Sequence, residues 1–187
     1  MGVSTPTRLP RVWLTRLLAG ALAIGNGIGG TGSAVQTLTA TLQPIAKVSV
    51  PASLSLTTGG VQFASFTGTL AVSYRARTTP TGSGTITAQV SSDFTPSGAS
   101  SPSAAAGALT FTCGSAGLGT PCSGTQTAST TAQTTVVTLP ASACTGGGGS
   151  CSSTDPATVN VNFILTNSPT YSTGTYTAHV ILRISAT

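Results

Sequence analysis

The stretch Tyr171-Ser-Thr-Gly-Thr-Tyr-Thr-Ala-His-Val-Ile-Leu-Arg-Ile-Ser-Ala-Thr187 carries the clearest structural signal in this chain. After Gly174 its residues alternate, and one of the two series is apolar: Tyr176, Ala178, Val180, Leu182 and Ile184. A period of two is the pattern of a β-strand with one buried face. We therefore expect a strand that is buried in the protein's own sheet, against a partner, or both.

Shorter alternating segments precede this strand, and no segment after residue 34 has a helical period. The segments are Leu38–Leu42, Val48–Val50, Leu54–Leu56, Leu70–Tyr74, Ile86–Val90, Leu109–Cys113, Val137–Leu139 and Val159–Leu165. Turn-forming clusters such as Thr57–Gly60 and Asn167–Pro169 separate them. The sequence predicts an all-β protein, an antiparallel immunoglobulin-like β-sandwich of about eight or nine strands.

The first 34 residues have the pattern of a cleaved signal peptide. Basic residues precede the apolar run Leu17–Ile24, and small residues ending at Ala34 follow it. A retained membrane anchor is the alternative, but the run falls short of the about 20 apolar residues that a spanning helix needs. We expect residues 35–187 to form a single β-sandwich domain without an integral membrane segment, secreted or located between the periplasm and the cell surface.

Removal of the signal peptide leaves very few charges. The remaining ionic residues give a net charge of 4 − 2 = +2: Lys47, Arg75, Arg77 and Arg183 against Asp93 and Asp155. Polarity comes instead from threonine and serine, of which the full chain has 36 and 24. This charge does not predict nucleic-acid binding. Threonine-rich strands with little charge are expected in an exported surface or filament protein.

Four cysteines in a chain that we expect to be exported favour disulfides: Cys113, Cys122, Cys144 and Cys151. We favour the local pairs Cys113–Cys122 and Cys144–Cys151, each of which would close a glycine-rich loop. A bond between Cys113 and Cys144 is the alternative if the strands bring these two residues together. The chain lacks C-x-x-C spacing, so we expect neither a zinc site nor any other cofactor.

The sequence contains no recognisable set of catalytic residues. Its one histidine, His179, belongs to the outward series of the last predicted strand, and no Gly-x-Ser-x-Gly motif occurs. Asp93 and Asp155 are the only acids, and each suits a turn residue that caps local backbone better than a glycosidase carboxylate. We therefore expect that the protein is not an enzyme.

Arg75, Arg77 and Tyr171 are the remaining ligand candidates. Arg75 and Arg77 share one face of a predicted strand, where they could bind an anion or a glycan. We favour the simpler interpretation, a solvated face that discourages edge-to-edge pairing. Tyr171 is expected at a chain corner with its hydroxyl on the backbone, and a ligand role is the alternative.

The ending Tyr-x-x-Gly-Thr-Tyr-x-x-x-Val-x-Leu-x-Ile-x resembles the last strand of secreted bacterial fimbrial-type domains, namely chaperone–usher pilins and the spore-coat-protein-U-like group. Gly174 is the fourteenth residue from the end, where such pilins often carry glycine. Ala186 departs from the pattern, because those pilins usually have an aromatic residue at the penultimate position. Leu38–Pro44 also looks like a pilin N-terminal strand.

The resemblance implies assembly by β-strand addition. A periplasmic chaperone would first fill a groove beside Thr175–Ser185, and Val35–Gln43 of the next subunit would then replace the chaperone. The candidate assembly residues are Leu38, Ala40, Leu42, Gly174, Tyr176, Val180, Leu182 and Ile184. In a self-contained sandwich, the apolar residues of Val35–Gln43 would instead be buried in the protein's own sheet, and we favour this burial for an isolated subunit.

We therefore expect a non-enzymatic surface or fimbrial structural subunit. The alternative is a monomeric extracellular module that binds cell wall or glycan through its loops. An ice-binding surface is a third hypothesis, and the lack of a regular Thr-x-Thr repeat argues against it.

Overall fold

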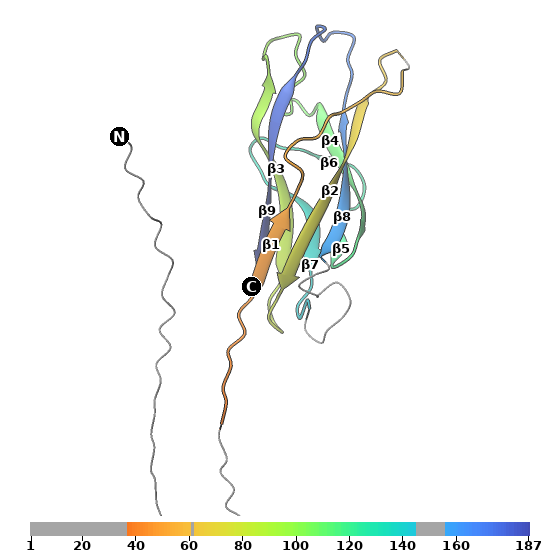
Figure 1. Ribbon diagram of the computed structural model, residues 1–187. Coiled ribbons are helices and arrows are strands. Elements are labelled where there is room, and N and C mark those ends of the chain that lie inside the picture. The colour runs from red at the N-terminus through yellow and green to blue at the C-terminus, as the bar shows by residue number, and fades with distance from the viewer. Residues whose placement is uncertain (1–36, 61, 145–155) are drawn as a thin grey trace, which may run out of the picture. The chain divides into compact units, whose positions relative to one another are not determined.

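A computed structural model describes residues 37–60, 62–144 and 156–187. These residues form nine strands and no helix (Figure 1). The strands are β1 (Ile45–Ser49), β2 (Phe66–Arg77), β3 (Gly84–Thr95), β4 (Leu109–Ala116), β5 (Thr120–Pro121), β6 (Gln126–Thr127), β7 (Thr134–Leu139), β8 (Ala157–Leu165) and β9 (Thr177–Ala186). The all-β prediction is confirmed, whereas the expected signal peptide lies outside the described residues.

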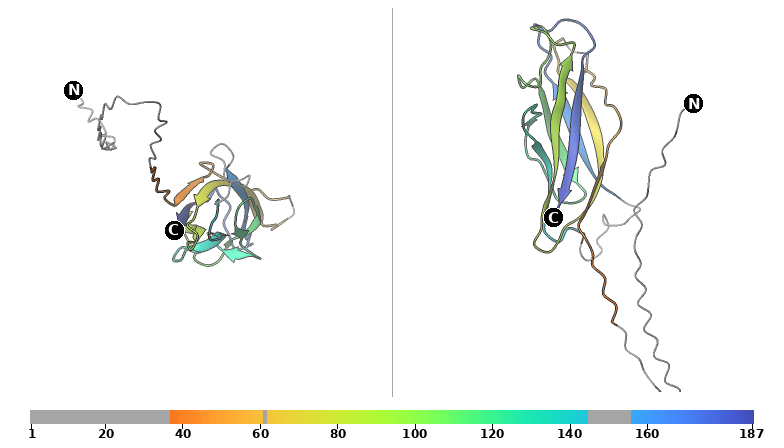
Figure 2. Two further views of the ribbon diagram at one scale, coloured as in Figure 1. Left: turned by 90° about the horizontal axis from the view of Figure 1, so that it is seen from below. Right: turned by 90° about the vertical axis from the view of Figure 1, so that its left-hand side faces the viewer.

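The strands pair in two antiparallel sheets that face each other. One sheet has the order β1-β2-β8-β4-β6, and the other has the order β5-β7-β3-β9. β2 and β8 pair without interruption from Phe66↔Leu165 to Tyr74↔Ala157. β1 and β9 end the two sheets on the same side of the sandwich and lie next to each other without pairing. Figure 2 shows β3 and β9 side by side in the second sheet.

Side chains that point inward from both sheets form the core. In β2 the residues Leu70, Val72 and Tyr74 are buried, while their neighbours in the strand are not. The rings of Phe111 and Phe163 lie 5.7 Å apart, centroid to centroid, and join β4 to β8. Each fully buried side chain of this kind contributes about 1.5–3 kcal/mol to folding. The predicted two-residue period therefore corresponds to real burial in the centre of the sandwich.

A disulfide between Cys113 and Cys122 joins β4 to the residue that follows β5, and so links the two sheets. The Cα atoms are 5.4 Å apart and the residues are nine positions apart in sequence. A loop of this length gives a stabilisation of about 3 kcal/mol or less in the loop-entropy account. The predicted local pairing is confirmed here. Cys144 is also disulfide-bonded, and its expected partner Cys151 lies outside the described residues.

Candidate assembly groove

The segment of residues 37–44, which precedes β1, forms no strand. Leu38 is 91% exposed, Leu42 is 76% exposed, and Ala40 is exposed as well. The expectation that these three residues are buried in the protein's own sheet is therefore wrong. The reason lies in the length of β2, because Ile45 already pairs with Arg77, the last residue of that strand. Residues before Ile45 have no strand opposite them.

β9 ends the four-stranded sheet, and only one of its edges is paired. It pairs with β3 from Gly84↔Ala186 to Thr95↔Thr177, and no described strand pairs with its other edge. Its inward residues Ala178, Val180, Leu182 and Ile184 are half-buried, in contrast to the fully buried inward residues of β8. The predicted strand and its alternation are confirmed, but its apolar face is incompletely covered.

A groove of about 610 Å³ opens beside the start of β9, and we call it the β9 groove. One wall is formed by the start of β9 and the residues just before it, and the other by the segment Val50–Leu56. Core side chains of the inner strands form its floor, among them Leu70, Leu109 and Phe163. The groove therefore joins an unpaired backbone edge to an apolar interior.

The segment Val50–Leu56 forms the second wall of the β9 groove without being a strand. A single isolated bridge, Thr57↔Thr67, attaches the chain after it to β2. At Gly68 of β2 an added Cβ would lie 2.8 Å from Leu56 and 3.0 Å from the Ser55 carbonyl, so glycine permits this close contact. No backbone hydrogen bond joins the described part of this segment to β9. The backbone edge of β9 thus stays unoccupied.

Residues 41–44 and the β9 groove lie at opposite ends of β9. The Gln43 carbonyl accepts hydrogen bonds from Nε and Nη2 of Arg77, at 3.2 and 2.6 Å. Two residues after Arg77, the Thr79 amide donates to the Thr187 carbonyl at 2.9 Å, which places Gln43 near the C-terminal end of β9. The groove borders Gly174–Val180 at the other end. Residues 41–44 therefore join the domain at the C-terminal end of β9, far from the β9 groove of the same chain.

Four of the candidate assembly residues line the β9 groove: Gly174, Tyr176, Val180 and Leu182. Ile184 lies farther along the same inward row of β9, opposite Ile86. The remaining three, in the N-terminal segment, are the exposed residues described above. Gly174 has no positive φ, and a Cβ there would meet the Tyr176 ring at 3.8 Å, an ordinary contact. Nothing in this conformation requires glycine at that position.

The ligand candidates divide between two places. Arg75 and Arg77 share the outward face of β2, as expected, but β1 forms the edge of that sheet. Their role in protecting an edge is therefore not supported. Within the described ranges no hydrogen bond of the Tyr171 hydroxyl is found, and the hydroxyl that donates to a backbone carbonyl in this region is that of Tyr176, to Ser172 at 2.8 Å. The Tyr171 amide donates to Ser168 in a turn.

Asp93 anchors the loop between β3 and β4, and the strand residues Phe94 and Leu109 on either side of this loop line the β9 groove. Its carboxylate accepts hydrogen bonds from the amides of Phe94, Ala104 and Ala105 and from the Ser103 hydroxyl. Burial alone would raise the pKa of Asp93, but these hydrogen bonds together lower it below its ordinary value. The expected role as a local backbone cap fits this geometry. Asp155 lies outside the described residues.

Metal-binding and membrane-spanning features are not found in the described part of the chain. No group of three or more His, Cys, Asp or Glu residues that could hold a metal ion occurs there. The same residues contain no helix with the length and hydropathy required to cross a bilayer. The β9 groove thus offers backbone and apolar contacts to an occupant.

Comparisons with known proteins give no matching family model, no matching curated protein and no matching solved structure. The resemblance of the last strand to fimbrial-type domains therefore stays a prediction from the sequence. The function has to be argued from the β9 groove and from the exposed apolar segment.

Proposed function

We propose that this protein is a secreted, non-enzymatic structural subunit that assembles at the cell surface by β-strand addition. In this proposal residues 1–34 are a cleaved signal peptide, and the domain is an immunoglobulin-like sandwich that accepts a strand from another copy. The observation that carries the proposal is the unpaired edge of β9 beside an apolar groove, in a chain that also exposes an apolar segment before β1.

The groove has the two features that strand addition uses. An incoming strand needs free backbone groups for pairing, and it needs apolar pockets spaced for every second side chain. The free edge of β9 supplies the first feature. The half-buried row Ala178, Val180 and Leu182, together with the apolar floor, supplies the second. A strand placed there would complete the cover that β9 lacks.

The segment Val35–Gln43 is the occupant that we propose. Leu38, Ala40 and Leu42 are two residues apart, so they lie on one face when the segment is extended. Leucines that are 91% and 76% exposed are costly in a monomer unless something covers them. Insertion into a groove would bury these side chains and pair the backbone of the segment.

The proposed donor belongs to a second copy of the chain. β9 has 10 residues, which extend over about 30 Å at about 3.3 Å per residue. Gln43 lies near the end of this strand and the groove lies at its start. β1 already lies beside β9 between these two places. The segment of the same copy would have to cross β1 to enter the groove, whereas a neighbouring copy can enter it from the start of β9. A chaperone strand would take the same place before assembly.

The experiment compares the exported protein with a variant that lacks residues 35–42. This deletion keeps Gln43, so the hydrogen bonds from Arg77 are retained. We expect the exported protein to form filaments or oligomers in electron microscopy and size-exclusion chromatography. The deletion variant should stay monomeric with a nearly unchanged urea midpoint, and it should bind a synthetic peptide of residues 35–43.

A peptide with aspartate in place of Leu38 and Leu42 is the matched control and should not bind. The proposal fails if the exported protein is monomeric at high concentration and the deletion variant does not bind the wild-type peptide. Monomers that are retained on peptidoglycan or glycan would instead favour an extracellular binding module.

A further inference from the structure

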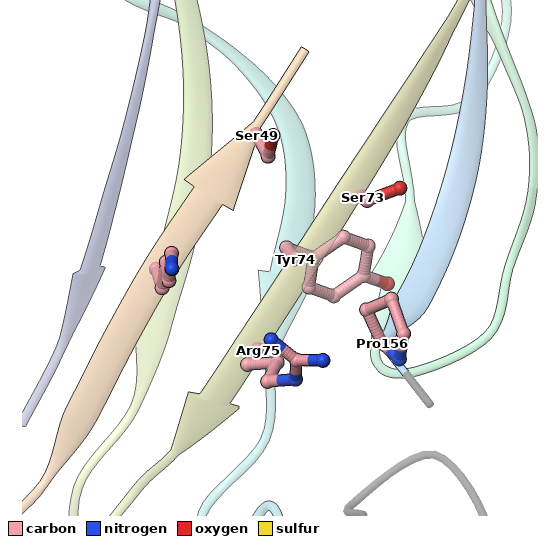
Figure 3. A pocket seen from close by; sticks show the side chains of 6 residues that line it. Ser49, Ser73, Tyr74, Arg75 and Pro156 are labelled. Atoms are coloured by element: carbon pink, nitrogen blue, oxygen red, sulfur yellow. The ribbon is translucent and has the colours of Figure 1, made fainter. Parts of the chain in front are cut away.

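A second pocket, of about 240 Å³, lies between β1 and β2 (Figure 3). It is lined by Lys47, Ser49, Ser73, Tyr74, Arg75 and Pro156. The sheet register explains why these side chains meet. Lys47 pairs directly with Arg75, and Ser49 pairs directly with Ser73. Residues that are directly opposite in an antiparallel pair point to the same face. Two cations and two hydroxyls are therefore gathered on one surface.

The two cations of this pocket have no described counter-ion. Like charges that are directly opposite on neighbouring strands repel each other. The one acidic side chain in the described ranges is Asp93, which belongs to the other sheet and accepts four local hydrogen bonds. The repulsion between Lys47 and Arg75 is thus uncompensated by any residue that the structure describes. An anion between them would remove it.

Arg75 also carries an unpaired donor. Its Nε atom is buried and has no hydrogen-bond partner. Two other arginines show the usual arrangement, since Arg77 donates to the Gln43 carbonyl and Arg183 donates to Gln89 at 3.1 Å. A buried N–H without an acceptor is unfavourable. An oxyanion that approaches the guanidinium from its Nε side can accept from Nε and from one Nη at the same time.

We propose that Lys47, Arg75, Ser49 and Ser73 form a binding site for a single sulfate or phosphate group. The Arg75 guanidinium donates hydrogen bonds to two oxygens of this group, the Lys47 ammonium supplies a second positive charge, and the serine hydroxyls donate to the remaining oxygens. The Tyr74 ring is buried, so no exposed aromatic face in the pocket is present to stack a sugar. The site thus recognises the charged group itself, which a free ion or an ester on a glycan can supply.

The test is a titration of the exported protein with sodium sulfate and sodium phosphate, against sodium chloride at constant ionic strength. Backbone amide shifts in the ¹⁵N spectrum should saturate at residues 47–49 and 73–75 with the oxyanions and not with chloride. Arg75→Gln and Lys47→Gln should each weaken the affinity by about tenfold or more, because each removes charged hydrogen bonds. Arg183→Gln makes the same charge change on a partnered arginine and should leave the affinity unchanged.

Two further experiments identify the source of the anion and test whether a residue of the protein itself is the counter-ion. A sulfated monosaccharide that binds more tightly than inorganic sulfate would identify an ester as the natural ligand, and the reverse order would identify the free ion. Asp155 precedes Pro156 in the sequence and lies outside the described residues. If the wild type does not bind and Asp155→Asn creates binding, Asp155 is the counter-ion and the proposal is wrong. Equal, unsaturable responses to sulfate and chloride would leave only a solvated cationic face.

Discussion

Replacement of Asp93 by alanine should loosen the loop between β3 and β4, which starts next to the β9 groove. One carboxylate oxygen accepts from the Phe94 amide at 2.8 Å and from the Ala104 amide at 2.7 Å. The other accepts from the Ser103 hydroxyl at 2.7 Å and from the Ala105 amide at 3.2 Å. Phe94 itself lines the groove. The carboxylate therefore ties the end of β3 to a loop about ten residues farther along the chain.

The loss of free energy of unfolding depends on how many of these hydrogen bonds are removed and on how buried they are. A hydrogen bond to a charged group contributes about 1.5–3 kcal/mol when it is buried, and less where water can replace it. The Ala105 contact is exposed, and the other three are partly buried. Because the four bonds share one carboxylate, their contributions do not add in full. We expect a loss of about 2–4 kcal/mol for Asp93→Ala and about half of that for Asp93→Asn, which keeps one acceptor oxygen.

The assay is urea unfolding of the disulfide-bonded protein as a function of pH. The pKa of Asp93 is lower in the folded protein than in the unfolded chain, where the pKa is about 3.9. The carboxylate thus stabilises the fold fully above the unfolded pKa, and this contribution is lost as the pH falls through the folded pKa. The difference between wild type and Asp93→Asn should shrink below about pH 4. A difference of less than about 0.5 kcal/mol at neutral pH, or one that does not change in acid, would refute the reasoning.

Three other changes test the groove and the core. Val180→Asp should abolish binding of the peptide of residues 35–43 to the deletion variant. Ile181→Asp should leave binding intact, because Ile181 is 40% exposed on the opposite face of β9. Equal peptide affinities of the two variants in fluorescence anisotropy would contradict the position of the groove. Joint replacement of Cys113 and Cys122 by alanine should lower the free energy of unfolding by about 2–3 kcal/mol, and an unchanged urea midpoint would argue against the bond as a stabilising link. Tyr74→Phe should lower the free energy of unfolding by about 1–2 kcal/mol in the same assay, because the Tyr74 hydroxyl donates to the Leu118 carbonyl and accepts from the Leu118 amide. A change near zero would mean that water takes the place of the hydroxyl.

The inner strands were predictable because their burial repeats along the chain. β8 has a buried residue at every second position, and β2 has one from Leu70 onward, and their Leu and Val residues make this visible in the sequence. β5 and β6 have two residues each, which is too short for any period to be visible. Leu54 and Leu56 alternate as a strand would, yet they form a wall of the groove by side-chain contact over Gly68 and not by backbone pairing. Alternation indicates that a segment has one buried face, but it does not indicate whether the backbone of that segment pairs with another strand.

The sites depended on long-range register, which the sequence does not display. The alternation after Gly174 predicts the strand and the assembly candidates, but the partner wall at Val50–Leu56 lies more than a hundred positions away in the chain. The sequence carries no signal that links Lys47 to Arg75, because only the pairing of β1 with β2 brings the two residues opposite each other. The wrong expectation for Leu38 arose in the same way, since the last residue of β2 decides how far a partner strand can extend.

The disulfide between Cys113 and Cys122 makes the two long seams of the sandwich mechanically unequal. It fastens one sheet to the other on the side where β4 and β5 lie, while the seam between β1 and β9 has no covalent link among the described residues. A small rotation of the two sheets about the disulfide-linked seam would widen the seam between β1 and β9. Under the proposed strand addition, a long occupant would enter or leave at the open seam by such a rotation, while the packed core is retained.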